Sequence, residues 1–202
     1  MPKRPREPSC SSSSGELHVA KHARLDHDDL PLLPALNLPL GAAAGAISAA
    51  AVVGGGRQLS RVTLADLLLL GGRSLVLVFL PMAFACSDEA HQLHARYAEF
   101  RARSAELAIV TGDSEYALLH WASSLGLTLP LLSDLTRSLA STLQCPIDSH
   151  TKCTLHSVYV IDHHHAVRHI SHATDAALFV AADIDAALAV AQALLSHQRV
   201  SE

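Results

Sequence analysis

Two runs of consecutive apolar residues constrain the fold of this chain more than any other feature. Ser74–Leu80, after its first residue, and Leu107–Val110 show no polar alternation, which is typical of strands buried on both faces of a sheet. Between them, Ser87–Arg103 has the pattern of an amphipathic helix. Its apolar positions fall three and four residues apart, at Ala90, Leu93, Tyr97 and Phe100. A helix that joins two buried strands of one sheet requires a crossover and therefore a parallel pairing.

Helices and strands continue to alternate along the rest of the chain. We expect further helices at Thr63–Leu69, Ser114–Leu125, Thr136–Leu143 and Asp183–Ser196. We expect a short strand at Leu129–Leu132, and a hairpin formed by Val158–Asp162 and Ala166–Ser171. From Ser74 the order is β-α-β-α-β-α-β-β-α. This order predicts an α/β, thioredoxin-like fold with a mostly parallel central sheet, an antiparallel pair and helices on both faces.

Composition divides the chain into three parts. Residues 1–30 are predicted to be a disordered tail, 31–56 form a Pro/Ala/Gly-rich segment that we leave unassigned, and 57–202 form the folded domain. Half of the residues are hydrophobic and the net charge is −4, which favours a packed domain and gives no reason to expect a nucleic-acid partner. Neither a secretory signal nor a membrane span is predicted. Four cysteines without a CxxC pair favour a reducing, cytoplasmic setting, and Lys3–Arg6 leaves nuclear import open.

Cys86 is the residue most suited to chemistry. It follows the first buried strand and opens the helix, with Asp88 and Glu89 directly after it. Unpaired backbone N–H groups and the helix dipole favour a thiolate at such a position, and the thiolate is the nucleophile. A small buried side chain without a chemical role is the alternative. The residues alone leave both interpretations open.

Several segments resemble the peroxiredoxin family. Leu77–Glu89 resembles the family segment F-Y-P-x-x-F-T-x-x-C-x-x-E. Val110–Ser114, His120-Trp121 and Leu129–Arg137 resemble, in their order along the chain, the run V-S-x-D-S, H-x-x-W and I-P-L-L-x-D-x-T-R. Tyr159–Asp162 resembles the strand F-I-I-D. The resemblance covers about residues 57–195, is nearest the two-cysteine subgroup and implies a thioredoxin-like fold.

The resemblance also implies the roles of four site residues. Cys86 matches the peroxidatic cysteine, Pro81 the proline that shields it, and Glu89 the glutamate of the motif. His156 stands where the family has an arginine that holds the thiolate charge. The loop between Pro81 and Cys86 is two residues shorter than the family's, and the missing pair includes its threonine. We therefore expect a weakened thiol peroxidase.

The implied partners are a peroxide substrate, thioredoxin or another thiol as reductant, and a second copy of the chain in a homodimer. No cofactor is predicted, and the candidate metal ligands Cys145, Cys153 and His156 match no zinc spacing, so no metal is predicted either. Cys145 and Cys153 are interpreted as free loop thiols, which favours a one-cysteine cycle. The alternative is a catalytically decayed protein that serves as a redox-sensing, binding or structural module.

Overall fold

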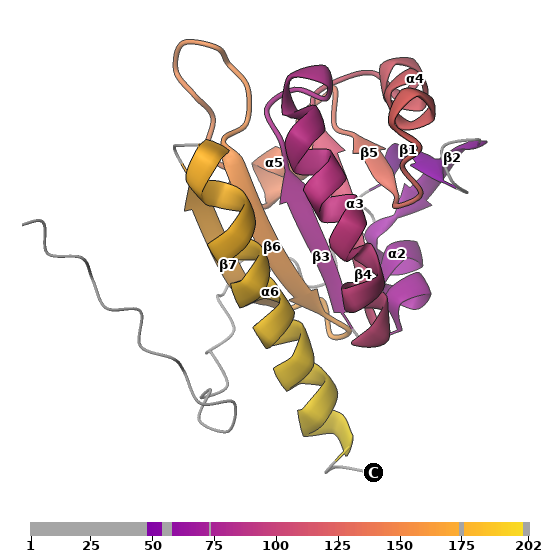
Figure 1. Cartoon of the computed structure of the whole chain (residues 1–202), viewed down its shortest axis with the longest axis vertical. Helices are drawn as coiled ribbons and strands as arrows, with labels where there is room; N and C mark the ends of the chain where they lie inside the picture. The colour runs from indigo at the N-terminus through magenta and orange to yellow at the C-terminus, as the bar shows by residue number, and fades with distance from the viewer. Residues whose placement is uncertain (1–47, 54–57, 73, 174–175, 200–202) are drawn as a thin grey trace, which may run out of the picture. The chain divides into compact units, whose positions relative to one another are not determined.

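The computed structural model of this chain describes residues 48–53, 58–72, 74–173 and 176–199 (Figure 1). These residues belong to one compact unit, Leu32–Glu202. The predicted tail at 1–30, the Lys3–Arg6 cluster and Cys10 lie outside the described residues.

In the described residues, seven strands form one sheet and five α-helices pack against it. The strands are β1 (Ser48–Val53), β2 (Gln58–Thr63), β3 (Ser74–Phe79), β4 (Ala105–Thr111), β5 (Leu131–Ser133), β6 (His156–Asp162) and β7 (Val167–Ala173). The helices are α2 (Leu64–Gly71), α3 (Ser87–Ala102), α4 (Glu115–Leu125), α5 (Ser138–Thr142) and α6 (Ala176–Arg199), with a 3-10 turn, η1 (Phe84–Cys86), before α3. Each helix and strand predicted from the sequence is present, and the α/β class is confirmed.

The sheet is mixed, with the strand order β2-β1-β5-β4-β3-β6-β7. Only the central pairings β3–β4 and β4–β5 are parallel among those described, because α3 and α4 provide crossovers between these strands. The other four described pairings, β1–β2, β1–β5, β3–β6 and β6–β7, are antiparallel. The expectation of a mostly parallel sheet is therefore corrected. The sequence pattern did not predict the β1–β2 hairpin, and β6 pairs with β3 in the antiparallel direction.

Strand β1 lies in the segment 31–56, which the sequence left unassigned. Its run of three alanines has low strand propensity. It is paired on both edges, with β2 and with β5, and Ala51 and Val52 are buried. Backbone pairing and burial therefore outweigh the intrinsic preference of alanine. Among the described residues, the sheet begins at Ser48, upstream of Arg57.

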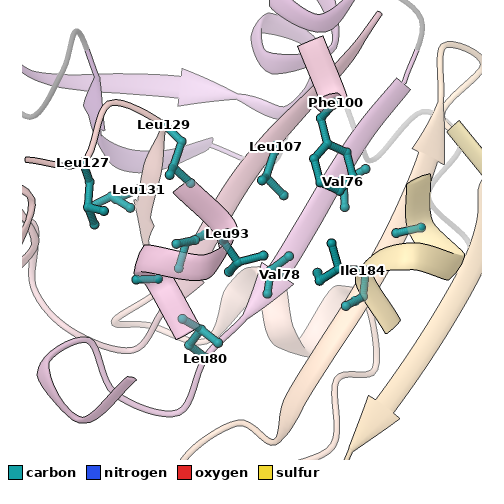
Figure 2. Packing of buried hydrophobic residues seen from close by; sticks show 14 of the residues in the cluster. Val76, Val78, Leu80, Leu93, Phe100, Leu107, Leu127, Leu129, Leu131 and Ile184 are labelled. Carbon is teal, nitrogen blue, oxygen red and sulfur yellow. The ribbon is translucent and has the colours of Figure 1, made fainter. Parts of the chain in front are cut away.

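Every residue of β3 and β4 is buried, and their side chains pack into two hydrophobic cores, one on each face of the sheet. On one face, Val76 and Val78 pack with Leu93 and Phe100 of α3 and with Ile184 of α6 (Figure 2). On the other face, apolar residues of α2 and α5 pack on the alternate positions of β3, which are Leu75, Leu77 and Phe79. Successive strand side chains point to opposite faces, so one buried strand supports both layers. The prediction of helices on both faces is confirmed.

Local signals set the helix ends. Thr63 and Asp66 form a capping box at the start of α2, in which each side chain accepts the other residue's backbone N–H. Ser114 caps α4, and Gly126 ends it in the left-handed conformation. Among the described helices, none is long and apolar enough to cross a membrane.

Candidate active site

Cys86 closes the 3-10 turn η1 and occupies the N-cap position of α3. Its backbone N–H donates to the carbonyls of Met82, at 3.2 Å, and Ala83, at 3.1 Å. Its thiol makes no capping hydrogen bond to the helix and is 4% exposed. The predicted order of strand, loop, cysteine and helix is therefore present, with the thiol turned into the protein.

The short loop before Cys86 is held by two side chains from other parts of the fold. The backbone N–H of Ala83 donates to Oδ2 of Asp113, which follows β4, at 2.8 Å. Trp121 of α4 donates its Nε1–H to Oγ of Ser87 at 3.1 Å, and that hydroxyl donates to the carbonyl of Phe84. Sequence reasoning assigned no role to Asp113 or Trp121, although both stand in the segments that carry the family resemblance. They anchor η1 and the first turn of α3.

His156 is the first residue of β6, and its ring reaches the thiol from the sheet. Its Nε2 atom lies 3.8 Å from Sγ of Cys86 and 3.8 Å from Oε1 of Glu89. The ligand-type atoms of these three residues all lie within 4.8 Å of one another. Three of the four residues predicted for the site are therefore brought together around one nitrogen.

The surroundings favour the uncharged forms of both Cys86 and His156. Burial raises the pKa of the Cys86 thiol; a backbone hydrogen bond at Met82 opposes this effect, whereas the nearby charges of Glu89 and Asp113 add to it. Burial lowers the pKa of the His156 ring, and the Glu89 carboxylate partly offsets this shift. Both shifts therefore favour a protonated thiol beside a neutral imidazole.

Pro81, the fourth predicted residue, lies two positions after Phe79, the buried end of β3, and is half-buried. It lines a pocket of about 190 Å³ together with Met82, Asp113 and Cys153. Cys86 is not among the described residues that line this pocket. Pro81 therefore contributes to the wall of a neighbouring cavity, next to the loop that carries the thiol.

The other described cysteines occupy different environments. Cys145 is buried in the core on the α2 and α5 face, and its thiol donates to Oγ of Ser157 at 3.5 Å. Ser157 and His156 are adjacent on β6, so their side chains point to opposite faces of the sheet. The metal ligands considered from the sequence, Cys145, Cys153 and His156, are therefore not assembled. Cys153 is half-buried, and all three described cysteines are free thiols.

Residues 41–170, more than half of the chain, match the AhpC/TSA family. Peroxiredoxin TSA1 of Saccharomyces cerevisiae is 30% identical over 109 residues, which are 50% of this chain and 55% of that protein. The chain thus spans about half the length of this curated relative.

Solved structures resemble the fold over a larger share. The reduced 2-Cys peroxiredoxin of Plasmodium vivax has a TM-score of 0.63 and 25% identity, and the match covers 76% of this chain and 94% of that one. Thioredoxin peroxidase I of Plasmodium yoelii has a TM-score of 0.64 and 25% identity, with 77% and 90% covered. These likenesses confirm the predicted peroxiredoxin resemblance and the thioredoxin-like fold.

Proposed function

We propose that this chain, which belongs to the AhpC/TSA family, is a divergent thiol peroxidase in which Cys86 reduces hydrogen peroxide or an organic hydroperoxide. The observation that carries the proposal is the 3.8 Å approach of Cys86 Sγ to His156 Nε2 at the start of α3. It puts a nitrogen that can accept or donate a proton beside a thiol at a helix N-terminus.

The proposed cycle begins when the neutral ring of His156 takes the thiol proton. The sulfur then attacks one peroxide oxygen, so that an S–O bond forms while the O–O bond breaks. Cys86 is oxidised to a sulfenic acid, and the leaving oxygen takes the proton from His156 and departs as water or an alcohol. An external thiol, thioredoxin or a smaller one, attacks the sulfenic acid and releases water. A second thiol reduces the resulting mixed disulfide and returns Cys86 to the start.

The reaction is expected to be weaker than that of a peroxiredoxin with the full residue set. An arginine provides a permanent charge and several donors for the thiolate and the developing negative charge on oxygen. His156 provides one nitrogen, and its burial favours the neutral ring. The short loop carries Phe84 and Ala85 before Cys86, and neither has a hydroxyl to place beside the peroxide.

A second candidate function is a sensing, binding or structural module without turnover. The observation that favours it is the position of Glu89 and Asp113, whose charges both raise the pKa of Cys86 and so oppose the thiolate. A protein with this role would consume peroxide no faster than an ordinary buried thiol does.

A homodimer is part of the proposal. Large apolar side chains next to the site are half or more exposed, among them Phe84 at 51% and Leu135 at 62%. Association of two copies through this surface would remove these side chains from water. Sedimentation of the chain at several concentrations would test the dimer.

The two candidate functions are separated by peroxide consumption with an excess of dithiothreitol and a metal chelator. The peroxidase account expects consumption that Cys86→Ser removes and that Cys145→Ser leaves unchanged, since Cys145 is on the other face of the sheet. Equal peroxide consumption by the wild type and Cys86→Ser would contradict the peroxidase and favour the sensing, binding or structural role.

A further inference from the structure

Glu89 and Cys86 approach the same nitrogen of His156. In a nucleophile–histidine–carboxylate relay, the carboxylate holds the ring nitrogen that faces away from the nucleophile. In this site both Sγ of Cys86 and Oε1 of Glu89 lie 3.8 Å from Nε2. The three atoms therefore surround a common point, which is the arrangement of ligands around a metal ion.

The distances agree with a tetrahedral metal site. Zinc binds sulfur at about 2.3 Å and nitrogen or oxygen at about 2.0–2.2 Å. At tetrahedral angles, neighbouring ligand atoms are then about 3.3–3.6 Å apart. The two distances of 3.8 Å lie close to this range, and all three ligand-type atoms lie within 4.8 Å of one another. Binding would draw the three side chains together around the ion.

The three residues stand on rigid elements. Cys86 and Glu89 are three positions apart at the start of α3, so their side chains share one face of the helix. His156 comes from β6, which pairs along its length with β3. The side chains of His156 and Glu89 are 10% and 14% exposed. The ligands are therefore held in place by the fold rather than by a mobile surface loop.

The ligand types and their charges also match a divalent ion. A thiolate and a carboxylate together carry two negative charges, which one divalent cation balances. Thiolate, imidazole and carboxylate together suit borderline ions such as Zn²⁺ rather than Mg²⁺ or Ca²⁺. Three protein ligands leave a fourth position for water.

We infer that Cys86, Glu89 and His156 form a binding site for a zinc-like divalent metal ion, which caps the reactive thiol. Binding replaces the thiol proton, so one sulfur–metal bond forms as one proton is released. No oxidation takes place, and the metal-bound sulfur is shielded from peroxide until the ion leaves. The site does not depend on the proposed peroxidase activity, because binding needs no peroxide.

Cobalt provides a direct test, because Co²⁺ takes tetrahedral zinc sites and shows a thiolate-to-metal absorption band when sulfur binds it. Full-length chain freed of metal with a chelator is titrated with Co²⁺, and Zn²⁺ is then added as competitor. We expect one equivalent of Co²⁺, the thiolate band, and displacement by Zn²⁺. Cys86→Ser should lose the band, and Glu89→Gln and His156→Gln should each weaken Zn²⁺ binding by more than about tenfold.

Two variants serve as controls. Cys153→Ser removes another free thiol, and replacement of His163, His164 and His165 by alanine removes the histidines of the β6–β7 turn. Both should keep the band and the Zn²⁺ affinity. The inference is overturned if wild type shows no thiolate band with Co²⁺, if the band survives in Cys86→Ser, or if only the turn histidines affect Zn²⁺ binding. Cys86→Ser replaces only the sulfur atom by oxygen, so we expect the variant to fold. Circular dichroism would check this.

Discussion

The Sγ atom of Cys86 and the Nε2 atom of His156 lie 3.8 Å apart, although 70 residues separate them along the chain. The antiparallel pairing of β6 with β3 produces this approach. Phe79 at the end of β3 pairs with Ser157, and His156 precedes Ser157 on β6. The chain leaves β3 through the short loop to Cys86 at the same end of the sheet. The shortened loop therefore still delivers the thiol to the position that the histidine can reach.

Replacing His156 by arginine should increase the rate of Cys86 oxidation by hydrogen peroxide by about ten- to a hundredfold. The guanidinium cannot take the thiol proton as the ring does, but its permanent charge and its donors stabilise the thiolate directly, so that the thiol loses its proton to water. Stopped-flow measurement of sulfenic acid formation would give the rate. His156→Gln is the matched control, and it should react more slowly than wild type. A decrease in rate for His156→Arg would contradict this prediction, because it would show that a fixed charge cannot replace proton transfer to the ring.

Replacing Asp113 by alanine should lower the free energy of unfolding by about 1–3 kcal/mol, because it leaves the Ala83 N–H without its acceptor. It should also slow peroxide oxidation of Cys86, since the loop loses an anchor. Asp113→Asn keeps an acceptor oxygen and should lose less stability. Urea unfolding of the three proteins measures the effect. Unchanged stability in the alanine variant would mean that this hydrogen bond does not hold the loop.

Replacing Ser87 by alanine should cost about 1–2 kcal/mol of stability. The change removes the hydroxyl that accepts from Trp121 and donates to Phe84, and the fully buried indole N–H is left without this partner. Trp121 is the only tryptophan in the sequence, so its fluorescence reports the unfolding directly. Ser123→Ala, on the exposed side of α4, is the comparison. Equal stability of the two variants would contradict the assigned role of Ser87.

Stability should fall as the pH drops below about 6.5, the ordinary pKa of histidine. Burial lowers the pKa of His169 and of His172, and Asp183 only partly offsets the effect at His169. The unfolded chain therefore binds protons at these rings more readily than the native chain, so acid favours unfolding. Urea unfolding at pH 7.5 and 5.5 should show this loss.

His169→Gln should reduce the difference in stability between the two pH values, because it removes one of the groups that take up protons on unfolding. His163→Ala, at an exposed position in the turn, should leave the difference unchanged. If His169→Gln lost as much stability between pH 7.5 and 5.5 as the wild type, His169 would be excluded as a cause of the acid destabilisation.

After treatment with peroxide, Cys86 should remain as a sulfenic acid that dimedone can trap. Cys145 lies on the opposite face of the sheet, and the Cys153 thiol donates to the carbonyl of Thr151 in its own loop. Cys145 is therefore not positioned to attack Cys86, and the hydrogen bond holds Cys153 in its own loop, so we expect an external thiol to complete the cycle. Peptide mass spectrometry would locate the adduct. A Cys86–Cys153 disulfide as the main product would show that the chain resolves its own sulfenic acid.

The sequence predicted the elements that bury the most apolar side chains. Ser74–Leu80 and Ser87–Arg103 have clear strand and helix patterns, and both elements are present within a few residues of the predicted bounds. The β1–β2 hairpin was missed because its alanines become buried only through pairing with β5, which a local pattern does not contain. The antiparallel return of β6 was missed for the same reason.

The site was predictable to a similar extent. Cys86 follows from its position at a helix start, which is a local feature, whereas Glu89 received its site role through the family resemblance. His156 was found only through the family resemblance, since nothing in its neighbourhood marks it. The anchor from Asp113 joins residues 30 positions apart, and the sequence gives no local sign of such a hydrogen bond. The approach of Cys86 Sγ and Glu89 Oε1 to one nitrogen of His156 is likewise a product of the tertiary fold.

The most direct test is the second-order rate constant for Cys86 with hydrogen peroxide, measured in a Cys145→Ser, Cys153→Ser background with a metal chelator present. Free cysteine at the same pH is the baseline. The account predicts a rate constant at least about tenfold above that baseline, because His156 takes the thiol proton and returns it to the leaving oxygen. A rate constant at or below that of free cysteine would contradict the proposed peroxidase.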